Sequence, residues 1–86
     1  ALPIYEQPVY DWPVLEANFK AVITSLKNED ETKQVNRQVL KAVEEKDAKQ
    51  FETIIKMNRK IFTSNLFLNT ASGVLAQVIS TILGIR

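Results

Sequence analysis

The last third of the chain is a long run of apolar and uncharged polar positions, and it constrains the fold more than any other stretch. From Ile61 to Ile85 there are 25 consecutive uncharged residues, and 14 of them are Ala, Val, Ile, Leu or Phe. Apolar residues recur at intervals of three and four, the spacing of one helix face: Ala71, Leu75, Val78, Ile82 and Ile85, with Val74 and Ile79 widening the stripe. We therefore expect a helix over 66–85 with a buried face.

A second row of this helix places a small residue at every fourth position: Ser72, Ala76, Ser80 and Gly84. Such rows allow a second helix backbone to approach closely, in membranes and also in soluble bundles. We predict that these four residues form a helix-packing face.

The sequence leaves three alternatives for the environment of residues 66–85: the core of a bundle, the surface of a membrane or partner, and the interior of a bilayer. A spanning helix needs about 20 mostly apolar residues, and Asn69, Gln77 and Ser80 interrupt this run. We therefore favour the bundle core, and lipid contact through 66–85 is the alternative.

The first predicted helix runs from Trp12 to Lys27. One apolar stripe runs along it: Leu15, Phe19, Val22 and Leu26. Pro13 suits the first turn of a helix, and Asp11 or Trp12 is then the cap.

The second predicted helix, near 29–46, has a thin apolar face and many charges. Asn28 followed by Glu31 has the spacing of a capping box, so Asn28 is the expected start. Valines at 35, 39 and 43 supply most of the apolar face.

The third predicted helix lies near 48–63, where Asp47 and Gln50 repeat the capping spacing. Phe51 and one or both of Ile54 and Ile55 should face the core. We expect a break at 63–65, before the uncharged helix begins.

These elements predict an all-α protein, a small up-and-down bundle of three to four helices. Residues 12–86 form the bundle domain, and residues 1–11 form an extended arm. Because residues 27–60 hold 16 of the 21 formal charges, we expect the middle helices to be a solvated wall. The first and last helices should then supply most of the core.

The arm repeats a five-residue unit that begins at Pro3, Pro8 and Pro13. Proline favours extended or polyproline backbone before the helix begins. The aromatic residues of the arm either cover the bundle or dock on another protein: Tyr5, Tyr10 and Trp12. Deleting residues 1–10 should leave the bundle folded, because no helical stripe begins before Val14.

Composition excludes most catalytic chemistry. The chain has no cysteine and no histidine, so thiolate nucleophiles, Cys-based or His-based metal sites and histidine general bases are impossible. No glycine-rich phosphate loop is present. We predict a protein that is not an enzyme and has no catalytic, metal or cofactor residues.

The formal net charge is +1, which does not support nucleic-acid binding, since phosphate contacts usually need a clear basic excess. The carboxylates Glu44, Glu45 and Asp47 cluster, but the lysines around them favour a solvated face over a metal site. The basic residues Lys56, Arg59 and Lys60 fall at a helix end, where cations complement the dipole. They could also contact phosphate or an anionic lipid headgroup.

Two classes of function fit these features. The first is a non-catalytic structural or interaction subunit that binds a partner protein or membrane complex through its arm and apolar last helix. The second is an apolar-ligand or membrane-surface binder, for which a cavity between the first and last helices would be evidence. A homo-oligomer is compatible with either class.

The outline of a proline- and aromatic-bearing arm before a helical bundle is similar to that of small extrinsic subunits on membrane complexes, including photosynthetic ones in the thylakoid lumen. That resemblance implies a peripheral subunit of a membrane complex. The chain begins with Ala, as expected either of a processed, exported or organellar protein or of an expressed fragment.

Overall fold

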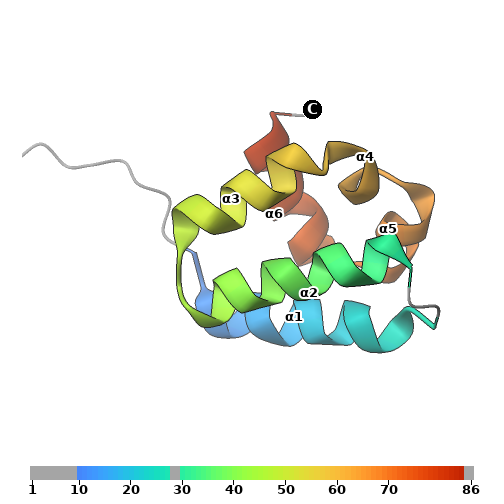
Figure 1. The fold of residues 1–86 in the computed structure, drawn as a ribbon, viewed down its shortest axis with the longest axis horizontal. Helices are drawn as coiled ribbons and strands as arrows, with labels where there is room; N and C mark the ends of the chain where they lie inside the picture. Colours follow the sequence, from blue (N-terminus) through green and yellow to red (C-terminus); the bar gives the residue numbers. More distant parts are fainter. Residues whose placement is uncertain (1–9, 28–29, 85–86) are drawn as a thin grey trace, which may run out of the picture.

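The computed structural model describes residues 10–27 and 30–84, and every regular element in these ranges is a helix (Figure 1). The helices are α1 (Trp12–Ser25), α2 (Glu31–Glu44), α3 (Ala48–Met57), α4 (Arg59–Phe62), α5 (Asn65–Thr70) and α6 (Gly73–Leu83). The predicted all-α class is confirmed. The described part has six helices where three to four were expected, because the last two predicted helices are each divided.

The first three helices run alternately up and down, as their short connections predict (Figure 1). α1 and α2 lie side by side, and α3 returns along α2. α4 and α5 form a compact corner at one end, and α6 passes behind α3 and across it (Figure 1). The uncharged part of the chain therefore closes the bundle with two short helices and one longer one.

Two predicted helix starts are confirmed by side-chain caps. Asp11 Oδ1 accepts a hydrogen bond from the Val14 amide at 3.4 Å, with Pro13 in the first turn of α1. Asp47 Oδ1 accepts from the Gln50 amide at 3.1 Å and begins α3. These caps occupy amides that have no partner within the helix.

The predicted start of α2 at Asn28 is wrong. Asp30 is the cap, since its Oδ1 accepts from the Lys33 amide at 3.2 Å and α2 begins at Glu31. Asn28 itself lies outside the described residues. Several cap-forming residue types occur together here, so the spacing alone could not select the right one.

The predicted helix 48–63 is divided at Asn58. The Asn58 side chain donates to the carbonyl oxygen of Ile54 at 2.8 Å, and its backbone leaves the helical region with φ −120° and ψ 39°. A side-chain amide that bonds to its own helix competes with the backbone ladder. The chain therefore turns at Asn58 before α4 begins.

The predicted helix 66–85 is divided as well. α5 ends at Thr70, and the next residue, Ala71, is extended with ψ 147°. Ser72 Oγ then accepts from the Leu75 amide at 3.3 Å and caps α6. The expected break at 63–65 is confirmed, because Ser64 Oγ accepts from the Phe67 amide at 3.2 Å and begins α5.

All six helices contribute to one core. The buried apolar side chains are Leu15, Phe19, Val22, Leu26, Val35, Val39, Ala42, Val43, Phe51, Ile54, Ile55, Phe62, Phe67, Leu75 and Ile79. The expectation that the first and last predicted helices supply most of the core is wrong. α2 buries as many apolar side chains as α1, because its few apolar residues all face inward while its charges face water.

One polar side chain, Asn36 of α2, is fully buried in this core. Its Nδ2 donates to the carbonyl oxygen of Thr32 at 2.8 Å, but its Oδ1 has no hydrogen-bond partner in the described part of the chain. A buried acceptor without a partner costs about 1–3 kcal/mol. Leucine has a similar branched shape and a higher helix propensity.

We expect Asn36→Leu to raise the free energy of unfolding by about 1–2 kcal/mol. The melting temperature should then rise by roughly 4–8 °C for each kcal/mol, and thermal denaturation measures this rise. Asn36→Ala is the control, since it removes the same oxygen without adding volume. If both variants melt below the parent, the oxygen is satisfied in solution and the prediction is wrong.

Candidate functional site

The strongest candidate for a functional surface lies on α5 and the first turn of α6. Three large aliphatic side chains are about half exposed there: Leu66 (47%), Leu68 (46%) and Val74 (48%). We call these three residues the C-terminal surface. Val74 was expected to widen the buried stripe of the last helix, and its exposure is a correction to that prediction.

α5 holds the two leucines outward because Phe67 between them points inward. Phe67 is fully buried and packs edge to face against Phe62, with ring centroids 5.0 Å apart. Successive residues on a helix are about 100° apart, so burial of Phe67 directs Leu66 and Leu68 to either side of it. The two leucines are therefore held by a rigid aromatic pair.

α6 is tied to α1 through its cap. The Ser72 hydroxyl donates to Asn18 Oδ1 at 2.6 Å, and Asn18 Nδ2 donates to the carbonyl oxygen of Val14 at 2.7 Å. This connection fixes the start of α6, which carries Val74. The exposed valine is thus positioned by a polar contact that joins distant parts of the sequence.

A hollow of about 240 Å³ adjoins Leu66, where α5 meets the end of α1 and the start of α2. Its lining residues are Ser25, Leu26, Lys27, Asp30 and Leu66. The hollow has one cation and one anion at its rim and aliphatic side chains in its wall. It could accept an apolar side chain from another molecule.

The aromatic residues predicted to bind a partner are placed differently. Tyr10 and Trp12 are half-buried and pack on Phe51, with ring centroids 5.2 and 5.9 Å away. Of the two arrangements considered for the arm, these two rings adopt the one in which they cover the bundle. Tyr5 lies outside the described residues, so its proposed role in partner binding stays a prediction.

A hydrogen bond also ties Tyr10 to the bundle, because its hydroxyl donates to the Glu52 carboxylate at 2.5 Å. Burial raises the pKa of Tyr10 well above its ordinary value, and the hydrogen bond to Glu52 and the charge of Glu52 raise it further. The phenol therefore keeps its proton to a higher pH than an exposed tyrosine does. Its contribution to stability is complete below the ordinary tyrosine pKa of about 10 and is lost as the pH rises beyond it.

The predicted helix-packing row is divided between two roles. Ser72 and Gly84 are the caps of α6, and Gly84 takes the left-handed conformation with φ 71°. A Cβ at Gly84 would meet no atom of the described residues within 4 Å. Ala76 and Ser80 lie within α6 and are half-buried. Close packing of the whole row against another molecule stays a prediction.

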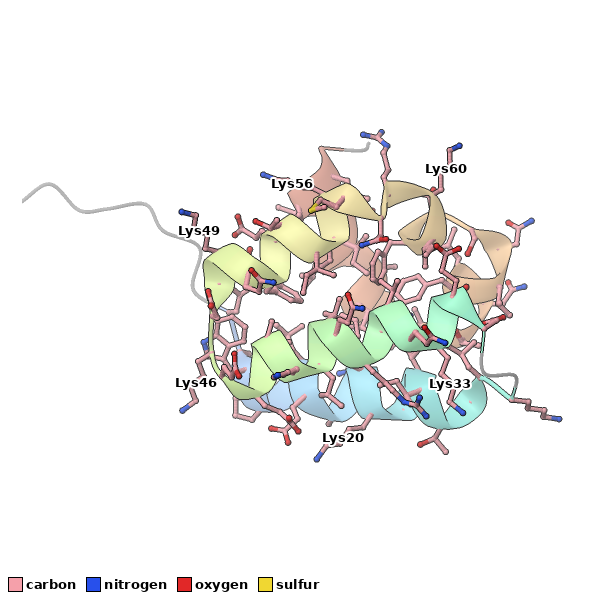
Figure 2. The ribbon with its side chains drawn as sticks, in the orientation of Figure 1. Lys20, Lys33, Lys46, Lys49, Lys56 and Lys60 are labelled. Atoms are coloured by element: carbon pink, nitrogen blue, oxygen red, sulfur yellow. The ribbon has the colours of Figure 1, made fainter. Side chains whose placement is uncertain are left out.

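The basic residues Lys56, Arg59 and Lys60 are all exposed where α3 gives way to α4. Figure 2 shows Lys56 and Lys60 pointing outward along the same edge of the molecule. The sequence pattern placed them at a helix end, and Lys56 does lie in the last turn of α3.

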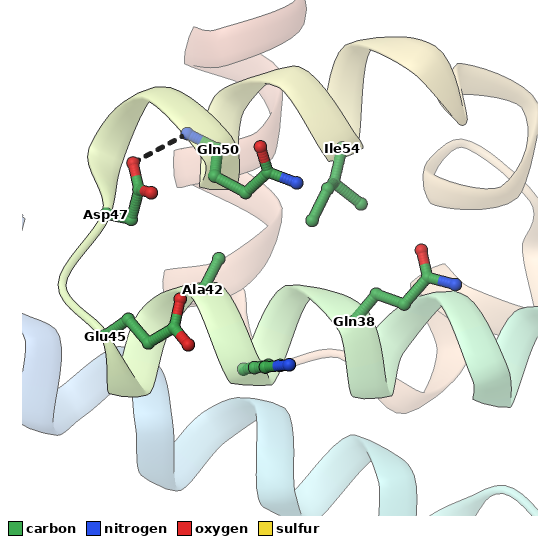
Figure 3. Close-up of a pocket in the computed structure, with 7 residues that line it drawn as sticks. Gln38, Ala42, Glu45, Asp47, Gln50 and Ile54 are labelled. Carbon is green, nitrogen blue, oxygen red and sulfur yellow. Dashed lines mark hydrogen bonds between the residues drawn. The ribbon is translucent and has the colours of Figure 1, made fainter.

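A different hollow, of about 360 Å³, lies between α2 and α3 (Figure 3). It is lined by Gln38, Lys41, Ala42, Glu45, Asp47, Gln50 and Ile54. Side chains of both charges face it, and one oxygen of Asp47 is already used in the cap of α3 (Figure 3). This lining does not suit an acyl chain. The smaller hollow beside Leu66 does lie between the first and last predicted helices, where the apolar-ligand alternative places its cavity, but Lys27 and Asp30 line it together with its two leucines.

The predicted solvated carboxylates Glu44, Glu45 and Asp47 are exposed. Within residues 10–27 and 30–84, no three acidic side chains gather as a group that could hold a metal ion. None of the helices in the same ranges combines the length and the hydropathy that crossing a bilayer requires.

Comparison of the chain with protein-family models, with curated proteins and with solved structures found no match. A functional proposal must therefore rest on the surfaces described above. The C-terminal surface was not singled out by the sequence, although its signal was present: Leu66, Leu68 and Val74 lie outside the best three-four stripe of the uncharged run.

Proposed function

We propose that this protein is a non-catalytic structural or interaction subunit that binds a partner protein through its C-terminal surface. The observation that carries the proposal is the half-exposure of Leu66, Leu68 and Val74 on a stretch without a single charge. Leu66 and Leu68 flank Phe67 on α5 and Val74 follows on α6, so the three exposed side chains fall within nine consecutive residues. Several exposed aliphatic side chains in one part of a chain are more typical of an interaction site than a single one.

The polar residues around this surface favour docking as well. Asn65, Asn69 and Gln77 are exposed and uncharged. A partner that covers them has to replace hydrogen bonds to water but does not have to remove water from an ion, which is far more costly. The surface therefore resembles the centre of an interface, where charged residues are depleted.

The available energy sets the kind of complex to expect. Fully burying a leucine or valine stabilises by about 1.5–3 kcal/mol, and about half of that remains to be gained at each of the three residues. Their sum is roughly 3 kcal/mol, whereas a micromolar complex requires about 8 kcal/mol. The hollow beside Leu66 and the amide side chains must supply the rest.

The arm takes a smaller share in this proposal than the sequence suggested. Tyr10 and Trp12 pack their rings against Phe51 of the same chain, so this apolar surface is not free for a partner. They hold the start of α1 beside α3. Partner contact by the arm is then proposed for residues before Tyr10, such as Tyr5.

Photo-cross-linking tests the proposal. A benzophenone side chain at position 66 should give a discrete adduct in an extract of the source cells, and one at the exposed position 41 of α2 should not. Excess unlabelled parent should suppress the adduct, and the double variant Leu66→Gln, Leu68→Gln should fail to do so. Glutamine keeps the helix propensity of leucine nearly unchanged.

Two outcomes would contradict the proposal: equal adducts from positions 66 and 41, or equal suppression by the parent and the double variant. Met57→Gln is the matched control, because Met57 is also exposed and apolar but lies on α3, outside the C-terminal surface. It should compete as well as the parent. An adduct formed by the pure chain alone would identify a second copy as the partner.

A further inference from the structure

The corner between α3 and α4 concentrates positive charge around one very exposed apolar side chain. Lys56, Met57, Arg59 and Lys60 are all exposed, and Met57 is the most exposed large hydrophobic residue described, at 78%. The break at Asn58 produces this arrangement, since it ends α3 and restarts the chain as α4 in a new direction. Residues on both sides of the break thus project from one corner.

The three cations form no ion pair with an acidic side chain of residues 10–27 and 30–84, although Glu31 lines a hollow together with Arg59 and Lys60. In the described part of the chain none of them forms a side-chain hydrogen bond that would engage its charge. The helices α3 and α4 together carry four basic residues and one acidic residue, Glu52. Glu52 lies in the middle of α3, one helical turn before Lys56, and its carboxylate accepts the hydrogen bond of Tyr10. The corner is therefore a local positive patch on a protein of net charge +1.

A hollow of about 420 Å³ lies at this corner and is lined by Glu31, Met57, Asn58, Arg59, Lys60 and Ile61. Two of its lining residues are cations, one is an anion, and Met57 and Ile61 are apolar. This combination suits a ligand that presents phosphate beside hydrocarbon.

We propose that the α3–α4 corner binds the surface of an anionic lipid membrane, with Lys56, Arg59 and Lys60 on the headgroups and Met57 entering the boundary of the acyl chains. Each cation near such a surface strengthens binding roughly fivefold, and three together roughly 100-fold. A nucleic acid or an acidic protein would use the cations but would gain little from Met57. The exposed methionine that lines the same hollow as Arg59 and Lys60 is what favours lipid.

Vesicle co-sedimentation of the full chain tests this proposal. The protein should bind vesicles of phosphatidylcholine mixed with phosphatidylserine and should bind vesicles of phosphatidylcholine alone much more weakly. Binding should fall as salt is added, because exposed charges are screened. Equal binding to both kinds of vesicle, or binding to neither, would overturn the proposal.

Two triple variants with the same change in net charge show whether the corner is responsible. Lys56→Gln, Arg59→Gln, Lys60→Gln should weaken binding on the order of 100-fold. Lys41→Gln, Lys46→Gln, Lys49→Gln, at the other end of α2 and α3, should keep most of it. Equal losses would mean that net charge alone attracts the protein, and the corner would then have no special role.

Met57→Gln leaves the charge unchanged and should still weaken binding severalfold, since it removes the apolar side chain that enters the lipid. If this variant binds as tightly as the parent, Met57 does not enter the lipid. If inorganic phosphate displaces the protein at low concentration, the site binds a free anion. Either result would overturn the proposal. Circular dichroism of each variant verifies its fold.

The vesicle experiment is independent of the proposed partner binding. Leu66→Gln, Leu68→Gln should leave vesicle binding unchanged, whereas the corner variants should leave the cross-linked adduct unchanged. Either proposal can therefore fail while the other stands.

Discussion

Replacing Phe51 with alanine is expected to leave the protein largely unfolded at physiological temperature. Phe51 is fully buried and meets three other rings edge to face: Tyr10 at 5.2 Å, Trp12 at 5.9 Å and Phe19 at 6.0 Å. Loss of a buried phenylalanine typically costs about 3–5 kcal/mol. A chain of this length has a total stability of only about 4–13 kcal/mol.

The cost at Phe51 should lie at the upper end of that range, because each edge-to-face pair adds about 0.5–1.5 kcal/mol beyond area burial. Urea unfolding followed by circular dichroism measures it. Gln50→Ala is the control, since the exposed neighbour on α3 should change stability by less than about 0.5 kcal/mol. A loss below about 2 kcal/mol for Phe51→Ala would show that the aromatic cluster is not central to the core.

The second large effect is expected at Leu75, the fully buried residue of α6. Leu75→Ala should cost about 2–5 kcal/mol. The sequence pattern ranks Ile82 with Leu75, since both lie on the same helical stripe. The structure separates them: Ile82 is only half-buried and packs at the edge of the core, so Ile82→Ala should cost clearly less.

Thermal denaturation of both single variants provides this comparison. We expect Leu75→Ala to melt well below Ile82→Ala, at a difference of about 4–8 °C for each kcal/mol. Equal melting temperatures would contradict the packing of α6, because they would place both side chains in equivalent surroundings.

Helix type and the apolar faces of α1 to α3 could be predicted from the sequence, because each depends on contacts close along the chain. The Leu15–Phe19–Val22–Leu26 stripe is buried as predicted, and the Asp47 cap forms. These features follow from residue spacing and from single side-chain hydrogen bonds.

The divisions at Asn58 and at Ala71–Ser72 could not be predicted from the same patterns. At each point a side-chain hydrogen bond to the backbone competes with continuation of the helix. Whether the helix breaks there depends on which apolar side chains the following helix can bury. The turn after α2 gives a related case, since Lys46 takes a left-handed conformation with φ 56°. Glycine usually marks such a turn, and a lysine there gives no signal.

The positions of Tyr10 and of the C-terminal surface depend on contacts between distant parts of the chain. Tyr10 reaches Glu52 and Phe51, which no periodicity could reveal. The expectation that the bundle stays folded without residues 1–10 remains a prediction, but the deletion should cost stability, because Tyr10 belongs to the aromatic cluster. The predicted boundary between the arm (1–11) and the bundle domain (12–86) therefore leaves Tyr10 in the arm, although its ring packs on the bundle.

The melting temperature of the Leu66→Gln, Leu68→Gln variant is the most direct test of the C-terminal surface as a binding surface, because such a surface requires that neither leucine belongs to the core. We expect a loss of roughly 1.5–3 kcal/mol, since about half of the burial energy of the two leucines is already gained on folding, together with loss of competition for the cross-linked partner. A variant destabilised by about 5 kcal/mol or more would place these leucines in the core, and the C-terminal surface would not be a binding surface.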